Sequence, residues 1–174
     1  VGEAARVTDN AFAVVSDPDI DIVVELIGGY TVAKDLILAA IENGKHVVTA
    51  NKALLATHGN EIFAAARARG VMVAFEAAVA GGIPIIKALR EGLTANRIEW
   101  VAGIINGTSN FILSEMRDKG LAFDAVLQEA QRLGYAEADP TFDIEGIDAA
   151  HKLTIMAAIA FGVPMQFDRA YTEG

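Results

Sequence analysis

The sequence predicts an α/β protein in which a parallel sheet is followed by a second, α+β part. Short apolar, β-branched segments alternate with helical segments over residues 21–75, and the connections between them are short. Such alternation is typical of parallel strands joined by right-handed helical crossovers. After Glu76 the alternation gives way to one longer strand and a run of helices. We therefore expect two domains, one of residues 1–76 and one of residues 77–174.

The first domain is expected to contain three short strands. Residues 21–27 form an apolar run that stops at Gly28-Gly29, which suits a buried strand of a parallel sheet. Thr31 is placed to cap the following helix, which Asn43-Gly44 ends. The other expected elements are a strand over residues 46–49, a helix over residues 52–69, a stop at Gly70 and a strand over residues 71–75.

The second domain is expected to be mainly helical, with one long strand. A short helix should follow Pro84, and residues 97–105 alternate as a strand does. An uncovered strand edge favours pairing with another chain, so this strand predicts a homodimer. In the polar turn within residues 103–110, either Ser109 or Thr108 caps the next helix or the turn lines the substrate pocket. The expected helices cover residues 109–119, 123–133 and 144–161.

Composition argues against several classes of protein. A formal net charge of −9 provides no basic field for nucleic acid or for an anionic membrane surface. No apolar run reaches the roughly 18–20 residues that cross a bilayer, so we expect a cytoplasmic protein. Cysteine is absent, which excludes disulfides, thiol catalysis and thiolate metal sites.

Residues 134–152 gather acidic side chains and one lysine around a glycine-containing loop and the start of a helix. Asp148 and Lys152 are four residues apart and should share one helix face, either as a solvated ion pair or as part of a cleft. The helix continues as a nearly all-apolar run, which predicts burial and a partly desolvated pair suited to proton transfer. Glu137 and Asp143 either reach the same cleft or are ordinary solvated loop residues.

Two further motifs lie near the expected sheet. Thr49-Ala50-Asn51-Lys52 follows a strand at the carboxyl edge, where open α/β sheets bind ligands. Lys52 there either contacts a phosphate or a reacting oxygen, or is a surface lysine of the first turn. Residues 76–84 combine Glu76 with a glycine-rich turn whose carbonyls suit a hard cation, although most such loops bind none.

Taken together, these motifs resemble those of homoserine dehydrogenases from about Asp21 to Gly174. This family interconverts aspartate semialdehyde and homoserine with NAD or NADP, and its first domain is Rossmann-like. The resemblance implies that Lys152 is the catalytic proton donor, that Asp148 acts beside it, and that Lys52 lies near the nicotinamide and the substrate. It further implies substrate contacts at Glu137, Asp148 and Asp143, cofactor contacts at Ile27, Gly28, Thr49, Lys52 and Gly134, and a sodium site at Glu76, Val79, Gly81 and Ile83.

The chain also departs from the family pattern. No Gly-x-Gly-x-x-Gly turn occurs, so the Rossmann-like sheet is expected to be partial and the choice between NAD and NADP cannot be read. We therefore expect little or no turnover from these 174 residues alone. Two rival interpretations are another nicotinamide-dependent oxidoreductase of similar plan and a non-catalytic module that keeps only the fold.

Overall fold

The computed structural model describes residues 5–174, which form two compact units. The first unit extends to Ile83 and the second runs from Pro84 to Gly174. The boundary between the compact units thus lies a few residues after the expected domain boundary at Glu76. The extent of the functional domains stays a prediction. Among the described residues, no helix combines the length and the apolar character needed to cross a bilayer.

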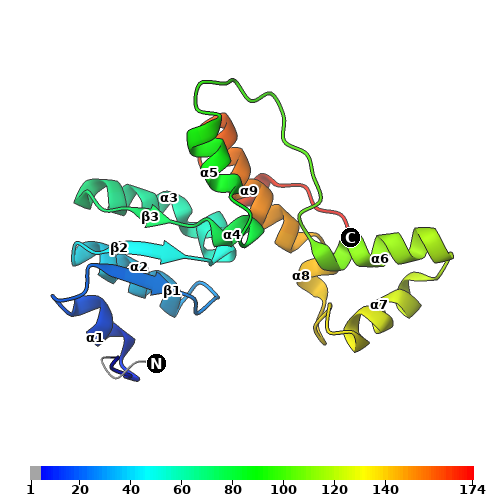
Figure 1. The fold of residues 1–174 in the computed structure, drawn as a ribbon, viewed down its shortest axis with the longest axis horizontal. Coiled ribbons are helices and arrows are strands. Elements are labelled where there is room, and N and C mark those ends of the chain that lie inside the picture. Colours follow the sequence, from blue (N-terminus) through cyan, green and yellow to red (C-terminus); the bar gives the residue numbers. More distant parts are fainter. Residues whose placement is uncertain (1–4) are drawn as a thin grey trace. The chain divides into compact units, whose positions relative to one another are not determined.

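The first unit contains the predicted parallel sheet (Figure 1). Its strands are β1 (Ile22–Glu25), β2 (His46–Thr49) and β3 (Val73–Ala74), in that order. Both neighbouring pairs are parallel. The helices α2 (Val32–Glu42) and α3 (Lys52–Arg69) connect them, as the alternation predicted. The first and last strands are each three residues shorter than expected, with four residues in place of seven in β1 and two in place of five in β3.

The core of the first unit lies between the sheet and these two helices, which pack against each other. It consists of apolar side chains with at most 4 % exposure, and each Leu or Ile contributes roughly 1.5–3 kcal/mol by burial. Ile22 and Val24 point to one face of β1 and are 55 % and 59 % exposed, so the expectation of a strand buried on both faces is wrong. The core residues include Leu36, Ile37, Ile41, Val47, Leu54, Leu55 and Ile62.

The helix ends of this unit follow from their backbone geometry. Asn51 accepts a hydrogen bond from the Leu54 amide at 3.1 Å and so caps α3, which ends at Gly70 with a φ of 69°. Thr31 precedes α2 but makes no capping hydrogen bond with its side chain. Its ψ of −87° departs from the extended geometry of a capping residue, so the prediction of a Thr31 cap is wrong. Before the sheet, Asn10 caps α1 (Ala11–Ser16).

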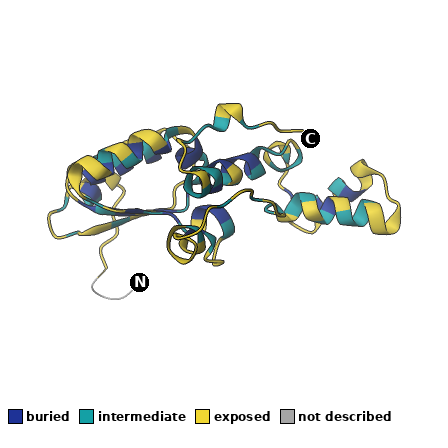
Figure 2. Ribbon diagram, turned by 90° about the horizontal axis from the view of Figure 1, so that it is seen from above, coloured by how far each residue is buried: buried dark blue, intermediate teal, exposed yellow. Residues whose placement is uncertain are grey.

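The second unit is built from helices. Figure 2 shows that this part of the chain exposes broad helix faces; the buried residues are Ile112 in α6 and Val126 and Ala130 in α7. Ile112, Val126, Ala130 and Ala136 form the core between them. The elements are α5 (Ile85–Lys87), the π-helix η1 (Ala88–Gly92), α6 (Gly107–Lys119), α7 (Phe123–Arg132), α8 (Thr141–Ile144), α9 (Ile147–Phe161) and the 3₁₀ helix η2 (Phe167–Arg169).

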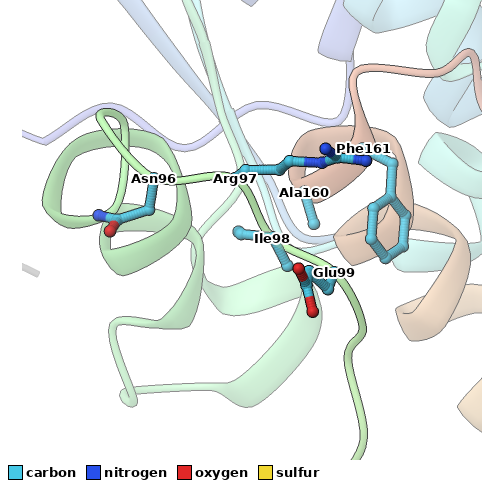
Figure 3. Close-up of a pocket in the computed structure, with 6 residues that line it drawn as sticks. All are labelled: Asn96, Arg97, Ile98, Glu99, Ala160 and Phe161. Carbon is cyan, nitrogen blue, oxygen red and sulfur yellow. The ribbon is translucent and has the colours of Figure 1, made fainter.

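The long strand expected over residues 97–105 is not formed. This segment carries no strand assignment, and no other strand occurs in residues 84–174 to pair with it. A strand is held by hydrogen bonds to a neighbour, so alternation alone cannot create one. Trp100 and Ile104 remain 73 % and 77 % exposed. Figure 3 shows the start of the segment beside the end of α9, with Arg97 reaching toward Phe161 across an open hollow.

Helix α9 is buried along one side, which confirms the predicted burial for that side only. Ala150, Ile155 and Met156 are at most 5 % exposed, whereas Leu153 and Phe161 are 41 % and 44 % exposed. The rings of Phe142 and Phe167 flank that of His151 on the same helix, with centroid distances of 6.1 and 4.4 Å. These rings join α8, α9 and η2.

Candidate functional site

The first turns of α9 hold a lysine–carboxylate pair. The Lys152 Nζ lies 2.7 Å from the Asp148 Oδ2, and it also donates to the carbonyl of Ile105 at 2.7 Å. The side chains are 16 % and 12 % exposed, so both charges are largely withdrawn from water. An ammonium has three protons, and these two contacts leave capacity for one more acceptor. The pair is therefore arranged to share a proton with a bound oxygen.

Asn106 links this pair to a second carboxylate. Its Nδ2 donates to the Asp143 Oδ1 at 2.7 Å and to the Asp148 Oδ2 at 2.9 Å. We call Asn106, Asp143, Asp148 and Lys152 the lysine cluster. Two carboxylates and one ammonium carry a formal charge of −1, which favours a ligand with a positive group.

Asn106 is also the cap of α6. Its Oδ1 accepts from the Ser109 amide at 2.8 Å, and its φ of −128° and ψ of 116° are those of a capping residue. The prediction that Ser109 or Thr108 caps this helix is wrong, because their hydroxyls donate elsewhere. Ser109 donates to the carbonyl of Asp143 and Thr108 to the carbonyl of Tyr135. Sequence reasoning missed Asn106, although an asparagine followed by a helix is a known capping signal.

A hollow of about 590 Å³ adjoins the cluster. Asn106 and Asp143 contribute to its lining, together with apolar side chains of α6 such as Leu113 and Met116. A cavity with an apolar wall and a few polar groups is the usual form of a small-molecule site. The second unit thus presents a carboxylate and an amide to a space of substrate size.

The structure leaves two predicted residues of this region outside the cluster. The side chain of Glu137 is exposed, and its backbone carbonyl accepts from the Gln131 Nε2 at 3.1 Å. Gly134 has a φ of 78° in the turn after α7, a conformation that favours glycine. The hydrogen bonds of the cluster involve Asp143 rather than Glu137.

A second polar network lies at the carboxyl edge of the sheet in the first unit. Glu25, at the end of β1, is only 3 % exposed. Its Oε1 accepts from the amides of Ile27 and Gly28 at 2.7 and 3.2 Å, and its Oε2 accepts from the Thr49 hydroxyl at 2.6 Å. We call Glu25, Thr49 and Asn51 the edge network. The sequence signal for Glu25 was a single carboxylate at the end of an apolar run.

Asn51 completes the edge network. Its amide N–H donates to the Thr49 hydroxyl at 2.9 Å, and its Nδ2 donates to the carbonyl of Gly29 at 2.6 Å. The loops after β1 and β2 are therefore fixed to each other. The Glu25 carboxylate already accepts the amide protons of Ile27 and Gly28 and the hydroxyl proton of Thr49. A ligand at this edge would therefore contact other atoms of these three residues. Lys52 follows, half-buried in the first turn of α3.

The turn after β3 contains the predicted cation ligands. Glu76 is half-buried and precedes α4 (Ala77–Ala80), and Gly81 has a φ of 59°. The turn hydrogen bonds of this segment are accepted by the carbonyls of Phe75, Glu76 and Ala80. Across residues 5–174, no three His, Asp or Glu side chains gather as a metal site. A cation here would depend on backbone oxygens and one carboxylate.

Comparison with known proteins assigns both parts of the chain to one family. A model described as homoserine dehydrogenase matches residues 84–174, and a model described as the NAD binding domain of homoserine dehydrogenase matches residues 2–76. The chain belongs to the homoserine dehydrogenase family. The rival assignment to another family of nicotinamide-dependent oxidoreductases is therefore set aside.

Individual homoserine dehydrogenases are closely similar in sequence. The enzyme of Pseudomonas aeruginosa is 75 % identical over 171 residues, which are 98 % of this chain and 39 % of the relative. That of Neisseria gonorrhoeae is 68 % identical over the same shares. The chain thus spans about two fifths of the length of these relatives.

Solved structures of the family share the fold. The crystal structure of a homoserine dehydrogenase from Thiobacillus denitrificans is 83 % identical with a TM-score of 0.94, over 96 % of this chain and 39 % of that one. A hyperthermophilic archaeal homoserine dehydrogenase in complex with NADPH is 31 % identical with a TM-score of 0.84, over 94 % of this chain and 51 % of that one. The predicted partial Rossmann-like α/β fold is confirmed.

Proposed function

We propose that this chain is the central and catalytic part of a homoserine dehydrogenase, which interconverts L-aspartate 4-semialdehyde and L-homoserine on the route to threonine and methionine. The observation that carries the proposal is the lysine cluster, where one half-buried ammonium pairs with a carboxylate that Asn106 links to a second carboxylate. The substrate has an α-ammonium group and a carbonyl, and this cluster offers complementary charge to the first and a proton donor to the second.

The charged residues of the site have complementary roles in the proposed reaction. During reduction, Lys152 gives a proton to the carbonyl oxygen of the semialdehyde, and it takes that proton back during homoserine oxidation. Asp148 holds the lysine and, with Asp143 and Glu137, neutralises the substrate ammonium. Lys52 is assigned to the same substrate from the first unit. The nicotinamide, when bound, supplies the hydride.

We place the cofactor, NAD or NADP, at the carboxyl edge of the sheet. The contacts proposed are Ile27, Gly28, Thr49, Lys52 and Gly134. Two features support this edge: the loop after β1 is fixed by Glu25, and a Cβ added at Gly28 or Gly29 would meet open space. A match to an NAD binding domain and a relative in complex with NADPH support the same cofactor class.

A monovalent cation, sodium, is proposed at Glu76 with the carbonyls of Val79, Gly81 and Ile83. The donor set fits, because hard cations prefer oxygen ligands and this turn offers one carboxylate and three backbone carbonyls. Its role would be to hold this turn.

Partners and location follow from the same assignment. We propose a homodimer in the cytoplasm, without nucleic acid or membrane partners. Residues 97–105 would form a strand once a second subunit supplies a hydrogen-bonding partner. The exposed apolar side chains of Trp100 and Ile104 support the proposal that a second subunit covers this surface. Size-exclusion chromatography with light scattering tests the dimer.

The reaction itself is tested by homoserine oxidation, followed as NADH or NADPH absorbance. The full-length enzyme should turn over homoserine, whereas the 174 residues alone should show little or no activity. Proximity of reactants supplies roughly 7–11 kcal/mol of a barrier, and the chain without a Gly-x-Gly-x-x-Gly turn has no phosphate cradle to hold the donor. A full-length protein that ignores homoserine would favour the non-catalytic alternative.

A further inference from the structure

We propose that Asn106 is a positioning residue for the proposed reaction, because its single amide fixes the two carboxylates around Lys152. This inference rests on the proposed function and gives an individual role to a residue that the sequence motifs placed only within a turn that could line the pocket. Asn106 is not itself a proton donor to the substrate.

The amide of Asn106 is fully used. A primary amide carries two donor protons, and Nδ2 has two carboxylate partners, at 2.7 Å on Asp143 and 2.9 Å on Asp148. Two neighbouring carboxylates repel each other, so without a donor between them they would move apart or recruit a proton. The bridge therefore holds the two carboxylates close to each other.

The orientation of this amide is also determined. Its Oδ1 faces the Ser109 amide at 2.8 Å, where only an acceptor can serve. Exchanging the oxygen and the nitrogen would turn an oxygen toward two carboxylates and a donor toward a donor. The cap of α6 thereby directs the Nδ2 at the cluster.

Asn106 is adjacent in sequence to the other anchor of Lys152. The carbonyl of Ile105 accepts from the Lys152 Nζ, and Asn106 holds the carboxylate that pairs with the same Nζ. Two consecutive residues thus fix both the lysine and its counter-ion. A shift of this short segment would change the geometry of the whole cluster.

A role as helix cap alone does not account for asparagine at this position. Serine, threonine and aspartate cap helices about as well, because capping needs only a side-chain acceptor. The short capping side chains differ in what else they offer, and asparagine adds two N–H donors to the acceptor. Asn106 donates from Nδ2 to two carboxylates, which a residue that served only as a helix cap would not need to do.

Three variants of the full-length enzyme separate the two roles. Asn106→Ser keeps a capping oxygen and loses the bridge, whereas Asn106→Ala loses both. We expect kcat for homoserine oxidation to fall roughly tenfold to a hundredfold in both variants, as loss of hydrogen bonds to charged groups implies. Only Asn106→Ala should also lower the Tm. Asn10→Ser, at the cap of α1, is the matched control and should leave kcat unchanged.

Asn106→Asp adds a readout that a structural role would not move. It keeps the cap and the shape but places a third negative charge beside Asp148 and Lys152. Added negative charge stabilises the ammonium form of the lysine, and homoserine oxidation needs the free amine. The pH profile of kcat for oxidation should therefore shift to higher pH in Asn106→Asp. The profile of Asn106→Ser should stay closer to that of the wild type.

The outcomes are distinct. Wild-type turnover with reduced kcat and normal Tm in Asn106→Ser supports the inference. Wild-type kcat and pH profile in both Asn106→Ser and Asn106→Asp overturn it and leave the proposed function standing. A wild-type enzyme that does not oxidise homoserine overturns the function and the inference together.

Discussion

Each unit contains an asparagine that caps a helix and also donates hydrogen bonds, but the groups that accept those bonds differ between the two units. Asn51 and Asn106 each cap a helix with Oδ1 and each donate from Nδ2 to a segment distant in sequence. In the first unit the amide reaches the backbone carbonyl of Gly29. In the second it reaches the carboxylates of Asp143 and Asp148. One network therefore fixes the shape of a loop, and the other fixes the position of charges.

Burial separates the two networks further. Glu25 and Thr49 are 3 % and 1 % exposed, and the Glu25 carboxylate accepts from the Ile27 amide and the Thr49 hydroxyl. Lys152 and Asp148 have side chains 16 % and 12 % exposed, next to a hollow that Asp143 helps to line. A satisfied, buried network contributes mainly to stability, whereas a partly open one keeps capacity for a ligand. Changes in the edge network should affect stability first, and changes in the lysine cluster should affect turnover first.

The largest expected effect in this comparison concerns Asp148. Asp148→Asn keeps the shape but removes the counter-ion of Lys152 and one charge for the substrate ammonium. We expect kcat/KM for homoserine to fall roughly a hundredfold, with a Tm close to that of the wild type. A matched change at an exposed carboxylate, Asp124→Asn in the first turn of α7, should leave both unchanged. A large drop in Tm for Asp148→Asn would remove the distinction between the two networks.

Glu25 should behave in the opposite way. Glu25→Ala leaves the Thr49 hydroxyl and the amides of Ile27 and Gly28 without their acceptor, which costs about 2–3 kcal/mol of unfolding free energy. Glu25→Gln keeps the size and an acceptor and should cost only about 1 kcal/mol. Urea denaturation measures both. Equal stability of all three proteins would contradict the structural role of this carboxylate.

A smaller effect is expected for Asn51, and it tests whether the edge network affects binding of the nicotinamide cofactor. Asn51→Ser keeps the cap of α3 and loses the bond to the carbonyl of Gly29. We expect about 1 kcal/mol of lost stability and a rise of a few fold in KM for the nicotinamide cofactor, because the loop after β1 becomes less fixed. An unchanged cofactor KM would place the cofactor away from this loop.

The smallest effect is electrostatic. Hydrogen bonds from the hydroxyl and amide of Thr141 hold the pKa of Asp139 below its ordinary value. Because the folded-state pKa is lowered, this contribution to stability is present above the unfolded pKa and is lost as pH falls through the folded one. Thr141→Val removes the stronger bond, so the pKa of Asp139 should rise toward its ordinary value. An NMR titration of the carboxyl carbon measures the shift.

Sequence reasoning predicted the elements with strong local signals. Residues 52–69 form α3 as expected, since alanine-rich helical periodicity ends at a glycine with positive φ. The parallel order of the three strands followed from their short connections. Residues 97–105 were predicted as a strand and are not one, because strand formation depends on a partner that local alternation does not specify.

The candidate site was predicted in part. The four-residue spacing of Asp148 and Lys152 led directly to their contact, because helix geometry fixes it. Asn106 and Glu25 were missed as network members, because their partners lie 37 and 24 residues away in sequence for the contacts to Asp143 and Thr49. Contacts of that kind depend on tertiary packing. Thr31, Thr108 and Ser109 were chosen as caps by residue type, whereas backbone geometry selected Asn106 for α6.

The most direct test is the rate of homoserine oxidation by the full-length enzyme and its Lys152→Ala variant. Lys119→Ala, which removes an exposed lysine from α6 of the same unit, is the control. We predict that Lys152→Ala lowers kcat by roughly a hundredfold to ten-thousandfold with a modest change in homoserine affinity, while Lys119→Ala behaves as the wild type. Near-normal turnover in Lys152→Ala would contradict the assignment of proton transfer to this lysine.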